Sequence, residues 1–555
     1  MSNFLEAIFA QLKRADDRVV LREIRGESFS EVTGKELLAQ VQSARGYLRQ
    51  FGLLPGDRCA LLGANSVEWI AVNLALMAEG IIVVPLYSRQ APTELVAMMK
   101  DCEPSLLVVD GADITDGVAR GWKERPHRVL MEEVLRVGPL RQPISEMPNS
   151  RKPGDIVTII YTSGTSGEAK GVTLNVGNVT HMLSCTGERL DQLMGSTSRP
   201  DHVFHYLPFN FAGSWILLLS CLARQSVLTL STDLNRLADE IRISAPDYFL
   251  NVPTLLERVK RGVLDSLAKR PFPIRMLFRK AQESWQRDRE GHFGRPDALD
   301  AIWLTLGRQL LFSRIKSRFG SHLRALICGS APLAVETQEF FMMLGIPVLQ
   351  VYGLTETTAI CTMDNPQIPP EPGYVGQAIS GVEMTIGDHE EIVVRGPNIF
   401  PGYWNRPGET ERVMKDGWLH TGDQGEKNKL GNWRIIGRLK NLIILNSGHN
   451  IAPEPIEERI GQLLSGAQQI VVVGNGRGYL CALITGETTA SNTQRVVDLV
   501  NTDLPHYQQI RNFTLLPHLF MAENSLLTAN GKLRREAIDR RFSAEIAAMY
   551  GGKNS

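Results

Sequence analysis

Short apolar runs alternate with longer mixed stretches along most of the chain. Cys59 to Leu62 is short and apolar, Ile81 to Pro85 is rich in β-branched residues, and Asn65-Ser66 between them has the composition of a helix cap. A buried strand after a crossover helix implies parallel pairing, which predicts a layered α/β sheet. The same pattern predicts further strands at Ser105 to Val109, Ile156 to Tyr161, Val227 to Leu230, Leu323 to Cys328 and Pro347 to Val351.

The pattern changes near Phe400. Gly, Asn and Asp are closely spaced in the blocks PGYWNRPGET and KDGWLHTGDQGEKNKLGNWRIIGR, which predicts short antiparallel strands. Apolar runs at Ile470 to Val473 and Leu480 to Ile484 then indicate a new compact unit that ends in a basic helical tail. We therefore expect a large N-terminal domain, residues 1–437, and a small C-terminal domain, residues 438–555, with the boundary at Arg438 to Lys440.

The composition is that of an ordinary globular protein, with 43% of the 555 residues hydrophobic and 22% charged. Sixty basic residues balance sixty acidic ones, so the global positive charge of a general nucleic-acid binder is missing. The seven cysteines form no CxxC pair, which favours reduced thiols in the cytoplasm. The amino terminus does not read as a secretory signal, and the apolar stretches Trp69 to Tyr87 and Leu217 to Leu230 are interrupted, which argues against membrane spans.

One segment departs from this balance. Arg258 to Arg324 contains 16 basic and 6 acidic residues, an excess of ten positive charges. It also contains large apolar residues that we expect to be exposed: Phe272, Leu277, Phe278, Trp285 and Trp303. Two interpretations remain open: a solvated helical insertion, or a face that docks on an anionic membrane surface.

The strongest chemical motif is the glycine- and hydroxyl-rich run from Tyr161 to Gly171, directly after the apolar strand IVTII. Glycines let the backbone approach an anion, hydroxyls donate hydrogen bonds to phosphate oxygens, and Lys170 supplies a point charge. The run lacks the GK[ST] of the Walker motif. A purely structural loop is the alternative, but the position after a strand and the terminal lysine favour phosphate.

Three further motifs follow in order. Val351 to Thr357 comes after another apolar strand, at the sheet edge where open α/β sheets bind ligands, and its Glu356 suits magnesium. Asp423 lies in a tight turn and can accept ribose hydroxyls, with Arg438 fifteen residues farther on. Lys532 follows a glycine near the carboxyl end, so a small second domain could carry it to a site elsewhere.

In this order and over this length, the motifs resemble the adenylate-forming superfamily of acyl-CoA synthetases, peptide-synthetase adenylation domains and luciferases, from about residue 15 to residue 540. The resemblance implies a large N-terminal domain of layered α/β sheets plus a distorted β-barrel, and a small mobile α+β C-terminal domain. It also implies a two-step reaction: ATP and a carboxylate give an acyl-adenylate and pyrophosphate, and a thiol then displaces AMP to give a thioester.

The resemblance also assigns roles to residues. Catalysis would rest on Lys532, Glu356 and Thr162, of which Thr162 and Glu356 would hold Mg²⁺. The phosphates of ATP would be bound by Thr162, Ser163, Gly164, Thr165, Ser166, Gly167 and Lys170. The rest of the nucleotide would be bound by Gly329, Ser330, Ala331, Pro332, Gln350, Val351, Tyr352, Gly353, Leu354, Thr355, Asp423 and Arg438. Lys440 would be the hinge, and Ser447, Gly448 and His449 would line the thiol tunnel for coenzyme A.

Within the superfamily, the chain is most similar to bacterial long-chain fatty acyl-CoA ligases, because it has an insertion between Val259 and Arg324. Phe211 stands where the family often has a histidine, so a histidine gate for the carboxylate is not expected here. Trp215 corresponds to an aromatic gate of some long-chain enzymes, with a core tryptophan as the equal alternative. A carrier protein as the thiol acceptor and a non-catalytic nucleotide-binding relative remain the alternative functions.

Overall fold

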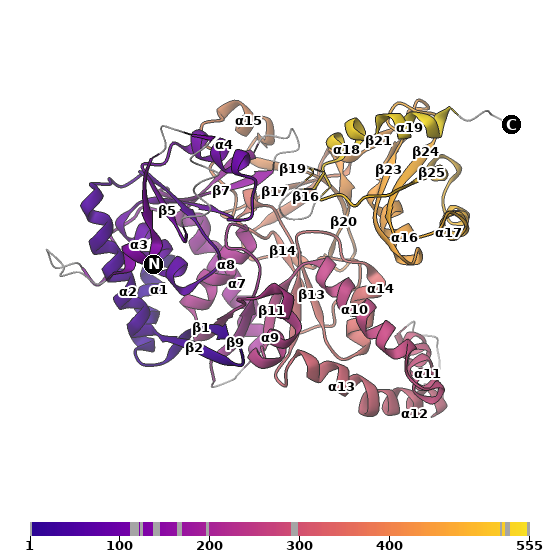
Figure 1. Ribbon diagram of the computed structural model, residues 1–555, viewed down its shortest axis with the longest axis horizontal. Coiled ribbons are helices and arrows are strands. Elements are labelled where there is room, and N and C mark those ends of the chain that lie inside the picture. Colours follow the sequence, from indigo (N-terminus) through magenta and orange to yellow (C-terminus); the bar gives the residue numbers. More distant parts are fainter. Residues whose placement is uncertain are drawn as a thin grey trace.

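The computed structural model describes residues 3–111, 121–122, 126–136, 145–163, 169–195, 199–289, 298–521, 524, 526–527 and 533–551. Figure 1 shows a large N-terminal part and a smaller C-terminal domain at one end, connected through β20 and the segment that follows it. The predicted mixed α/β class with a large and a small domain is confirmed.

The first sheet of the N-terminal domain has six strands in the order β6-β5-β3-β4-β7-β8. All its pairs are parallel except the last, in which β7 and β8 form an antiparallel hairpin. The central strands are buried on both faces, as expected for a parallel sheet covered by helices. The strands are β3 (Arg58–Leu62), β4 (Ile82–Leu86), β5 (Leu106–Val109), β6 (His127–Leu130), β7 (Ile156–Ser163) and β8 (Ala169–Asn175).

The second sheet has nine strands in the order β15-β14-β13-β12-β11-β9-β10-β1-β2. Its central strands are parallel and its ends antiparallel. Strands expected from the apolar runs are therefore present in both sheets. The strands are β1 (Val19–Arg25), β2 (Ser28–Thr33), β9 (Asp201–His205), β10 (Ser226–Leu230), β11 (Tyr248–Asn251), β12 (Ala325–Cys328), β13 (Val348–Tyr352), β14 (Thr362–Met363) and β15 (Gln377–Ala378).

A helical layer joins the two sheets into one core. Helix α3 packs against strands of both sheets, α8 against the nine-stranded sheet and α7 against the six-stranded sheet. Helix α8 is apolar nearly all round, which is typical of a helix with no face to water. The helices that cover these sheets are α1 (Phe4–Ala15), α2 (Gly34–Leu48), α3 (Val67–Glu79), α4 (Pro92–Cys102), α6 (Met131–Leu135), α7 (Val176–Met194), α8 (Ala212–Ala223), α9 (Leu237–Ser244) and α14 (Val335–Met343).

The turn-rich region forms a five-stranded antiparallel sheet, as its turn pattern predicts, in the part of the chain for which the resemblance implies a distorted β-barrel. It contains β16 (Glu383–Ile386), β17 (Glu391–Arg395), β18 (Met414–Lys415), β19 (Trp418–Lys427) and β20 (Trp433–Arg438), with helix α15 (Pro407–Val413) before β18. The C-terminal domain has an apolar core of its own. It contains β21 (Ile443–Ile444), β22 (Asn450–Ile451), β23 (Ala467–Val473), β24 (Leu480–Gly486), β25 (Ile510–Leu516), α16 (Glu454–Leu463), α17 (Ala490–Thr502), α18 (Arg535–Arg541) and α19 (Ser543–Tyr550).

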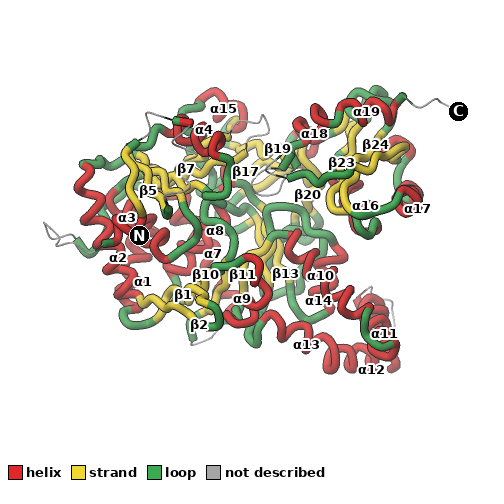
Figure 2. The backbone as a smooth tube through the Cα atoms, viewed as in Figure 1, coloured by secondary structure: helices red, strands yellow, loops and turns green. Residues whose placement is uncertain are grey.

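The basic segment between β11 and β12 is helical, as predicted. It consists of α10 (Pro253–Ala268), α11 (Phe272–Arg289), α12 (Ala298–Gly307) and α13 (Ser313–Lys316), which Figure 2 shows as a mainly helical projection at the lower right. Phe272 is 64% exposed, as expected, but Phe278 is buried, and the prediction for Phe278 was wrong. The physical reason is that Phe278 faces α12 and meets Phe312 edge to face.

No helix within the described ranges is long and apolar enough to cross a bilayer. The two interrupted apolar stretches of the sequence fold instead as α3 with β4 and α8 with β10, in the protein core.

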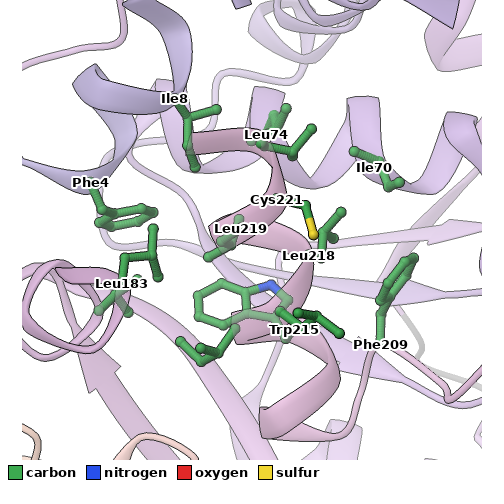
Figure 3. Close-up of a cluster of buried hydrophobic side chains, with 14 of the residues drawn as sticks. Phe4, Ile8, Ile70, Leu74, Leu183, Phe209, Trp215, Leu218, Leu219 and Cys221 are labelled. Carbon is green, nitrogen blue, oxygen red and sulfur yellow. The ribbon is translucent and has the colours of Figure 1, made fainter. Parts of the chain in front are cut away.

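Trp215 is fully buried on α8, among side chains of several helices (Figure 3). Phe4 and Ile8 of α1, Leu74 of α3 and Leu183 of α7 surround the same helix. The indole nitrogen donates to Asn73 Oδ1 at 3.4 Å, so even its polar atom is used inside the core. This position favours the core alternative over the gate for Trp215.

Trp215→Phe should lower the free energy of unfolding of the N-terminal domain by about 2–4 kcal/mol, because it leaves a cavity and an unpaired buried Asn73 oxygen. Urea unfolding would measure the loss. The control Trp418→Phe, at a half-buried tryptophan, should cost less than about 1 kcal/mol. Unchanged stability of Trp215→Phe together with an altered preference for acyl chain length would contradict core packing and restore the gate.

Candidate active site

The phosphate motif lies on the β7–β8 hairpin. Thr162 and Lys170 are register partners across the two strands, and Ser163 pairs with Ala169. The connecting residues Gly164, Thr165, Ser166 and Gly167 lie outside the described residues. The strands are anchored by burial of Val157, Ile159 and Ile160, so the hairpin places a hydroxyl and an ammonium group at the two ends of the same loop.

Lys170 is held by two side chains of a distant segment. Its ammonium group forms an ion pair with Glu409 and lies 5.2 Å from the centre of the Tyr403 ring. The hydrogen bond from Lys170 lowers the pKa of Glu409, so the pair is charged at neutral pH. The lysine expected to bind phosphate is therefore neutralised by a carboxylate in this conformation.

Residues 402–404 run alongside β8 and explain how Tyr403 reaches Lys170. The backbone N–H and hydroxyl of Thr173 both donate to the Gly402 oxygen, at 3.2 and 2.6 Å. The Trp404 N–H donates to the Gly171 oxygen at 2.8 Å. Gly171 is closely packed, since a Cβ there would lie 2.7 Å from Ile159 Cγ2. The fit of this segment against the hairpin thus requires glycine at position 171.

Glu356 is joined to the same segment from the other sheet. It lies in a short helical turn, Thr355–Thr357, directly after β13. The Tyr403 hydroxyl donates to Glu356 Oε1 at 2.8 Å, and the Phe400 N–H donates to the Glu356 backbone oxygen at 2.9 Å. Burial, and then the nearby Glu356 carboxylate, raise the pKa of Tyr403, so the phenol stays protonated and remains a donor. Tyr403 therefore connects the first two chemical motifs.

Asp423 joins the second motif to the third. Its carboxylate accepts a hydrogen bond from the Tyr352 hydroxyl at 2.8 Å and forms an ion pair with Arg438 Nε at 2.8 Å. Asp423 and Arg438 are register partners on β19 and β20, which explains why residues fifteen apart meet. Asp423 is buried whereas Arg438 is half-exposed, so this carboxylate is at the base of the cluster and the guanidinium at its rim.

The segment Gly329 to Pro332 packs on the second motif. A Cβ on Gly329 would lie 2.5 Å from Val351 Cγ2, so only glycine allows this approach. Ser330 has a φ of 75°, in the left-handed region that non-glycine residues rarely adopt. Gly353 is equally tight, because a Cβ there would lie 2.5 Å from Ile360 Cα. Ala331, Pro332 and Leu354 belong to the same two loops.

Gln350 forms hydrogen bonds to two other residues of the protein core. Its N–H donates to the Asp364 carboxylate at 2.7 Å and its side chain donates to Gln338 Oε1 at 2.8 Å. Burial raises the pKa of Asp364 to about 7. Gln350 therefore supports β13 from behind, while Val351 on the opposite face of the strand meets the Gly329 loop.

The C-terminal domain meets the N-terminal domain through polar side chains. Arg534 donates to Glu94 of α4 at 2.6 Å, and Arg459 pairs with Glu336 of α14 at 3.5 Å. Burial, and then the charges of Glu336 and Glu257, raise the pKa of Glu458 to about 7. Lys532 lies outside the described residues, but Arg534, two residues later, brings that end of the chain to α4.

The residues predicted to form the hinge and the thiol tunnel are exposed, and the predicted gate residue Phe211 lies beside the core. Lys440 is exposed in the short helical turn between β20 and β21. Ser447, Gly448 and His449 form the exposed tip between β21 and β22, where His449 stacks on Tyr507. Within the tip, the Ser447 hydroxyl lies 2.9 Å from His449 Nδ1. Phe211 is partly buried at the start of α8.

Tyr403 and Glu409 are the site residues that the sequence reasoning missed. Both lie in the block PGYWNRPGET, whose turn residues predict short antiparallel strands. The strand prediction is wrong for this block, which forms turns and then α15, and contact with Lys170 and Glu356 depends on a bridge to a strand more than 200 residues earlier. The block does contain an aromatic hydroxyl and a carboxylate among glycines, and these residue types could have indicated site residues.

Metal binding by the protein alone is not favoured here. The described residues contain no group of three or more His, Cys, Asp or Glu side chains that could hold a metal ion. Glu356 has one carboxylate oxygen bonded to Tyr403, and Thr162 offers a hydroxyl. Such a sparse set suits Mg²⁺, which usually keeps its waters and binds one or two carboxylates together with substrate phosphates.

Comparison with known proteins agrees with this geometry. The long-chain-fatty-acid–CoA ligase FadD15 of Mycobacterium bovis is 25% identical over 99% of this chain and 97% of its own length. Long chain acyl-CoA synthetase 3 of Arabidopsis thaliana is 26% identical over 93% of this chain and 86% of its own. ATP-bound MatB from Rhodopseudomonas palustris has the same fold, with a TM-score of 0.73 at 23% identity, covering 98% of this chain and 99% of that one.

Family profiles account for nearly all of the chain. The AMP-binding enzyme profile matches residues 8–404, and the profile of the AMP-binding enzyme C-terminal domain matches residues 440–554. The first match alone spans more than half of the sequence. The chain belongs to the AMP-binding enzyme family.

Proposed function

We propose that this protein activates a long-chain fatty acid with ATP and transfers the acyl group to coenzyme A, releasing pyrophosphate and AMP. The observation that carries the proposal is the convergence of Lys170, Glu356 and Tyr403 from three distant segments. Lys170 can bind phosphate and the Glu356 carboxylate can bind Mg²⁺, and both lie beside Tyr403. This combination fits a nucleoside triphosphate with its magnesium ion. The names of the full-length relatives support a fatty acid as the substrate and coenzyme A as the acceptor.

In the first half-reaction, a carboxylate oxygen attacks the α-phosphorus of ATP and the P–O bond to pyrophosphate breaks. Asp423 accepts the ribose hydroxyls, with Arg438 beside them, and the loops Gly329–Pro332 and Gln350–Thr355 line the adenine. Thr162 to Lys170 hold the β- and γ-phosphates. When bound by Thr162 and Glu356, Mg²⁺ supplies charge neutralisation at the phosphates.

Lys170 changes its partner when the nucleotide binds, whereas Glu356 keeps its hydrogen bond from Tyr403. Before binding, Glu409 neutralises Lys170 and Tyr403 fixes one oxygen of Glu356. Phosphate oxygens then compete with Glu409 for the lysine, while the Tyr403 hydroxyl continues to orient Glu356. Tyr403 and Glu409 are thus positioning residues, one for the metal carboxylate and one for the resting lysine.

In the second half-reaction, the thiol of coenzyme A attacks the acyl carbon and AMP leaves. Residues 438–555 act as a mobile domain that turns about Lys440. Lys532 serves the adenylation step, and Ser447, Gly448 and His449 line the thiol route after the turn. The polar contacts of Arg534 and Arg459 with the N-terminal domain support such motion, because they are replaceable by water.

The protein acts in the cytoplasm at the inner face of the membrane, where long-chain acids are dissolved in lipid. Its seven cysteines are free, which is expected in a reducing compartment. An acyl carrier protein instead of coenzyme A is the alternative acceptor, since both present the same thiol arm. Turnover of acids of graded chain length, measured as AMP released with coenzyme A, tests the proposal. No AMP release with any acid would refute it.

Lys532→Ala should slow adenylation by about 10²–10³, because one preorganised cation at a developing charge contributes that much. Thioester formation from preformed acyl-adenylate should be nearly unchanged. Pyrophosphate release and single-turnover thioester formation measure the two steps separately. Lys415→Ala, at an exposed lysine on β18, is the control and should affect neither step. Equal loss of both steps in Lys532→Ala would refute the assigned role.

Tyr403→Phe should raise the Mg²⁺ concentration needed for half-maximal adenylation by roughly tenfold, because hydrogen bonds to charged groups contribute about 1.5–3 kcal/mol. The ring beneath Lys170 is kept. Mg²⁺ titration of pyrophosphate release provides the measurement. Tyr479→Phe, whose hydroxyl bonds to the Met549 oxygen in the C-terminal domain, is the matched control. An unchanged Mg²⁺ requirement would exclude the positioning role.

Glu409→Gln should lower the KM for ATP severalfold with little change in kcat, because it removes the carboxylate that competes for Lys170. Lys170→Ala should change KM in the opposite direction. If Glu409→Gln raises KM instead, Glu409 helps to place Lys170 on the nucleotide rather than competing with it.

Lys440→Pro should hinder rotation of the C-terminal domain, because proline fixes φ near −65°. Adenylation would persist while thioester formation falls. Comparing the two half-reactions in single turnovers gives the result, and an equal loss of both would place the hinge elsewhere.

A further inference from the structure

The helices after α10 form an arm that projects from the N-terminal domain (Figure 1). This helical arm consists of residues 272–289 and 298–319. Its inner face is well packed: Phe278 meets Phe312 with ring centres 6.1 Å apart, and a Cβ on Gly307 would lie 2.5 Å from Ala281 Cβ. The arm is therefore a rigid support for whatever its outer face carries.

The outer face of α12 and of the helical turn that continues it, residues 308–312, carries an apolar stripe of four residues. Leu299, Ile302, Leu306 and Leu310 are 61%, 53%, 36% and 47% exposed. Their spacing of three, four and four residues puts them on one side of the helix. The inward-facing Leu304 is buried, so α12 is apolar on two faces and only one of them is covered by protein. Clustered exposed leucines of this kind indicate a contact surface.

Basic residues continue along the same helical run. Arg308, Arg314 and Arg318 are exposed, and no acidic side chain among the described residues is paired with them. Two of the arm's three acidic residues are occupied, since Asp300 binds Arg287 at 2.5 Å and Glu283 binds Lys280 at 2.9 Å, while Asp288 is exposed on α11. The stripe is thus flanked by positive charge that no acidic side chain in the described part of the chain neutralises.

The positions of these charges and apolar side chains move the expected membrane contact from α10 and α11 to residues 298–319. The sequence directs attention to the cations of α10 and α11, but Arg279 and Lys280 both face Glu283. Phe278 is buried. Lys269, Arg270 and Arg275 are exposed near Phe272, but the larger exposed apolar stripe lies on residues 298–319, together with three exposed arginines.

We propose that the apolar stripe of α12 inserts into the interface of an anionic bilayer, with Arg308, Arg314 and Arg318 at the level of the lipid phosphates. Basic helices with one apolar face bind such interfaces, and each nearby cation contributes to the attraction. A second copy of this chain is disfavoured as the occupant. Two arms docked face to face would bring together two segments that each contain nine basic and three acidic residues, an excess of six positive charges.

The position of the arm connects this surface to the candidate site. The chain enters the segment at the carboxyl end of β11, where the Gly329 N–H donates to the Asn251 oxygen at 3.3 Å. Lys260 of α10 donates to Thr337 of α14, the helix that follows the Gly329 loop. The docking proposal depends on the proposed function in one respect only: it assumes that the substrate is an acid dissolved in lipid.

Co-sedimentation with vesicles tests the proposal. Wild-type protein should pellet with a two-to-one mixture of phosphatidylcholine and phosphatidylglycerol and much less with phosphatidylcholine alone. The triple variant Arg308→Gln, Arg314→Gln, Arg318→Gln should bind the mixed vesicles roughly 100-fold more weakly, since each cation contributes about fivefold. The variant Leu299→Gln, Leu306→Gln, Leu310→Gln should weaken binding by more than about tenfold.

Matched controls separate docking from general effects. Leu499→Gln alters an equally exposed leucine on α17, and Lys415→Gln with Lys429→Gln and Arg511→Gln removes three exposed charges elsewhere. Both controls should pellet like wild type. Thermal unfolding midpoints of all variants should agree, because the altered side chains are exposed. A variant that unfolds early is replaced by the single change Ile302→Gln, which should still weaken binding.

Unchanged pelleting of both triple variants would overturn the proposal. So would a wild-type dimer in light scattering that the leucine variant alone converts to a monomer, because the stripe would then be a protein interface. Turnover of a soluble short-chain acid should be unaffected in every variant. If the wild type releases no AMP with any acid yet pellets as expected, the ligase function fails and the docking surface stands.

Discussion

The contact of Tyr403 with both Glu356 and Lys170 is the interaction on which the candidate site depends. The hairpin belongs to the six-stranded sheet, the turn after β13 follows a strand of the nine-stranded sheet, and β8 of the hairpin packs against that turn. Tyr403 spans them with one hydrogen bond and one cation–π contact, and its backbone is fixed by the bonds of Gly402 and Trp404 to β8. Because phenol protonation is favoured by burial and by Glu356, this link persists across the physiological pH range.

The site is stabilised both by close packing of backbone segments and by hydrogen bonds and ion pairs between side chains. Gly171, Gly329 and Gly353 allow backbone segments to approach without side chains between them. Asp423 is buried, yet its two oxygens have separate partners in Tyr352 and Arg438, which limits the cost of burying a charge. The rigid part of the site is therefore built before any ligand arrives, in agreement with the general need for preorganised charge.

The periphery contrasts with this rigid centre. The C-terminal domain has its own apolar core, and it meets the N-terminal domain through ion pairs at Arg534 and Arg459 and through the packing of α16 on β20. Burial there, and then the nearby charges of Glu336 and Glu257, raise the pKa of Glu458. The ion pairs are easily exchanged for water. The helical arm on the other side is firmly packed inside and apolar outside.

The sequence by itself determined the strands, the α/β layering, the two-domain division and the family, because short apolar runs and glycine-rich motifs are local features. It also singled out Lys170, Glu356, Asp423 and Arg438, whose residue types carry the chemistry. Tertiary structure alone decided that Tyr403 and Glu409 belong to the site, that Trp215 is packed in the core, and that the exposed apolar face is on α12. Each of these depends on which distant segments pack together, and a one-dimensional pattern does not contain the long-range pairing that selects those neighbours.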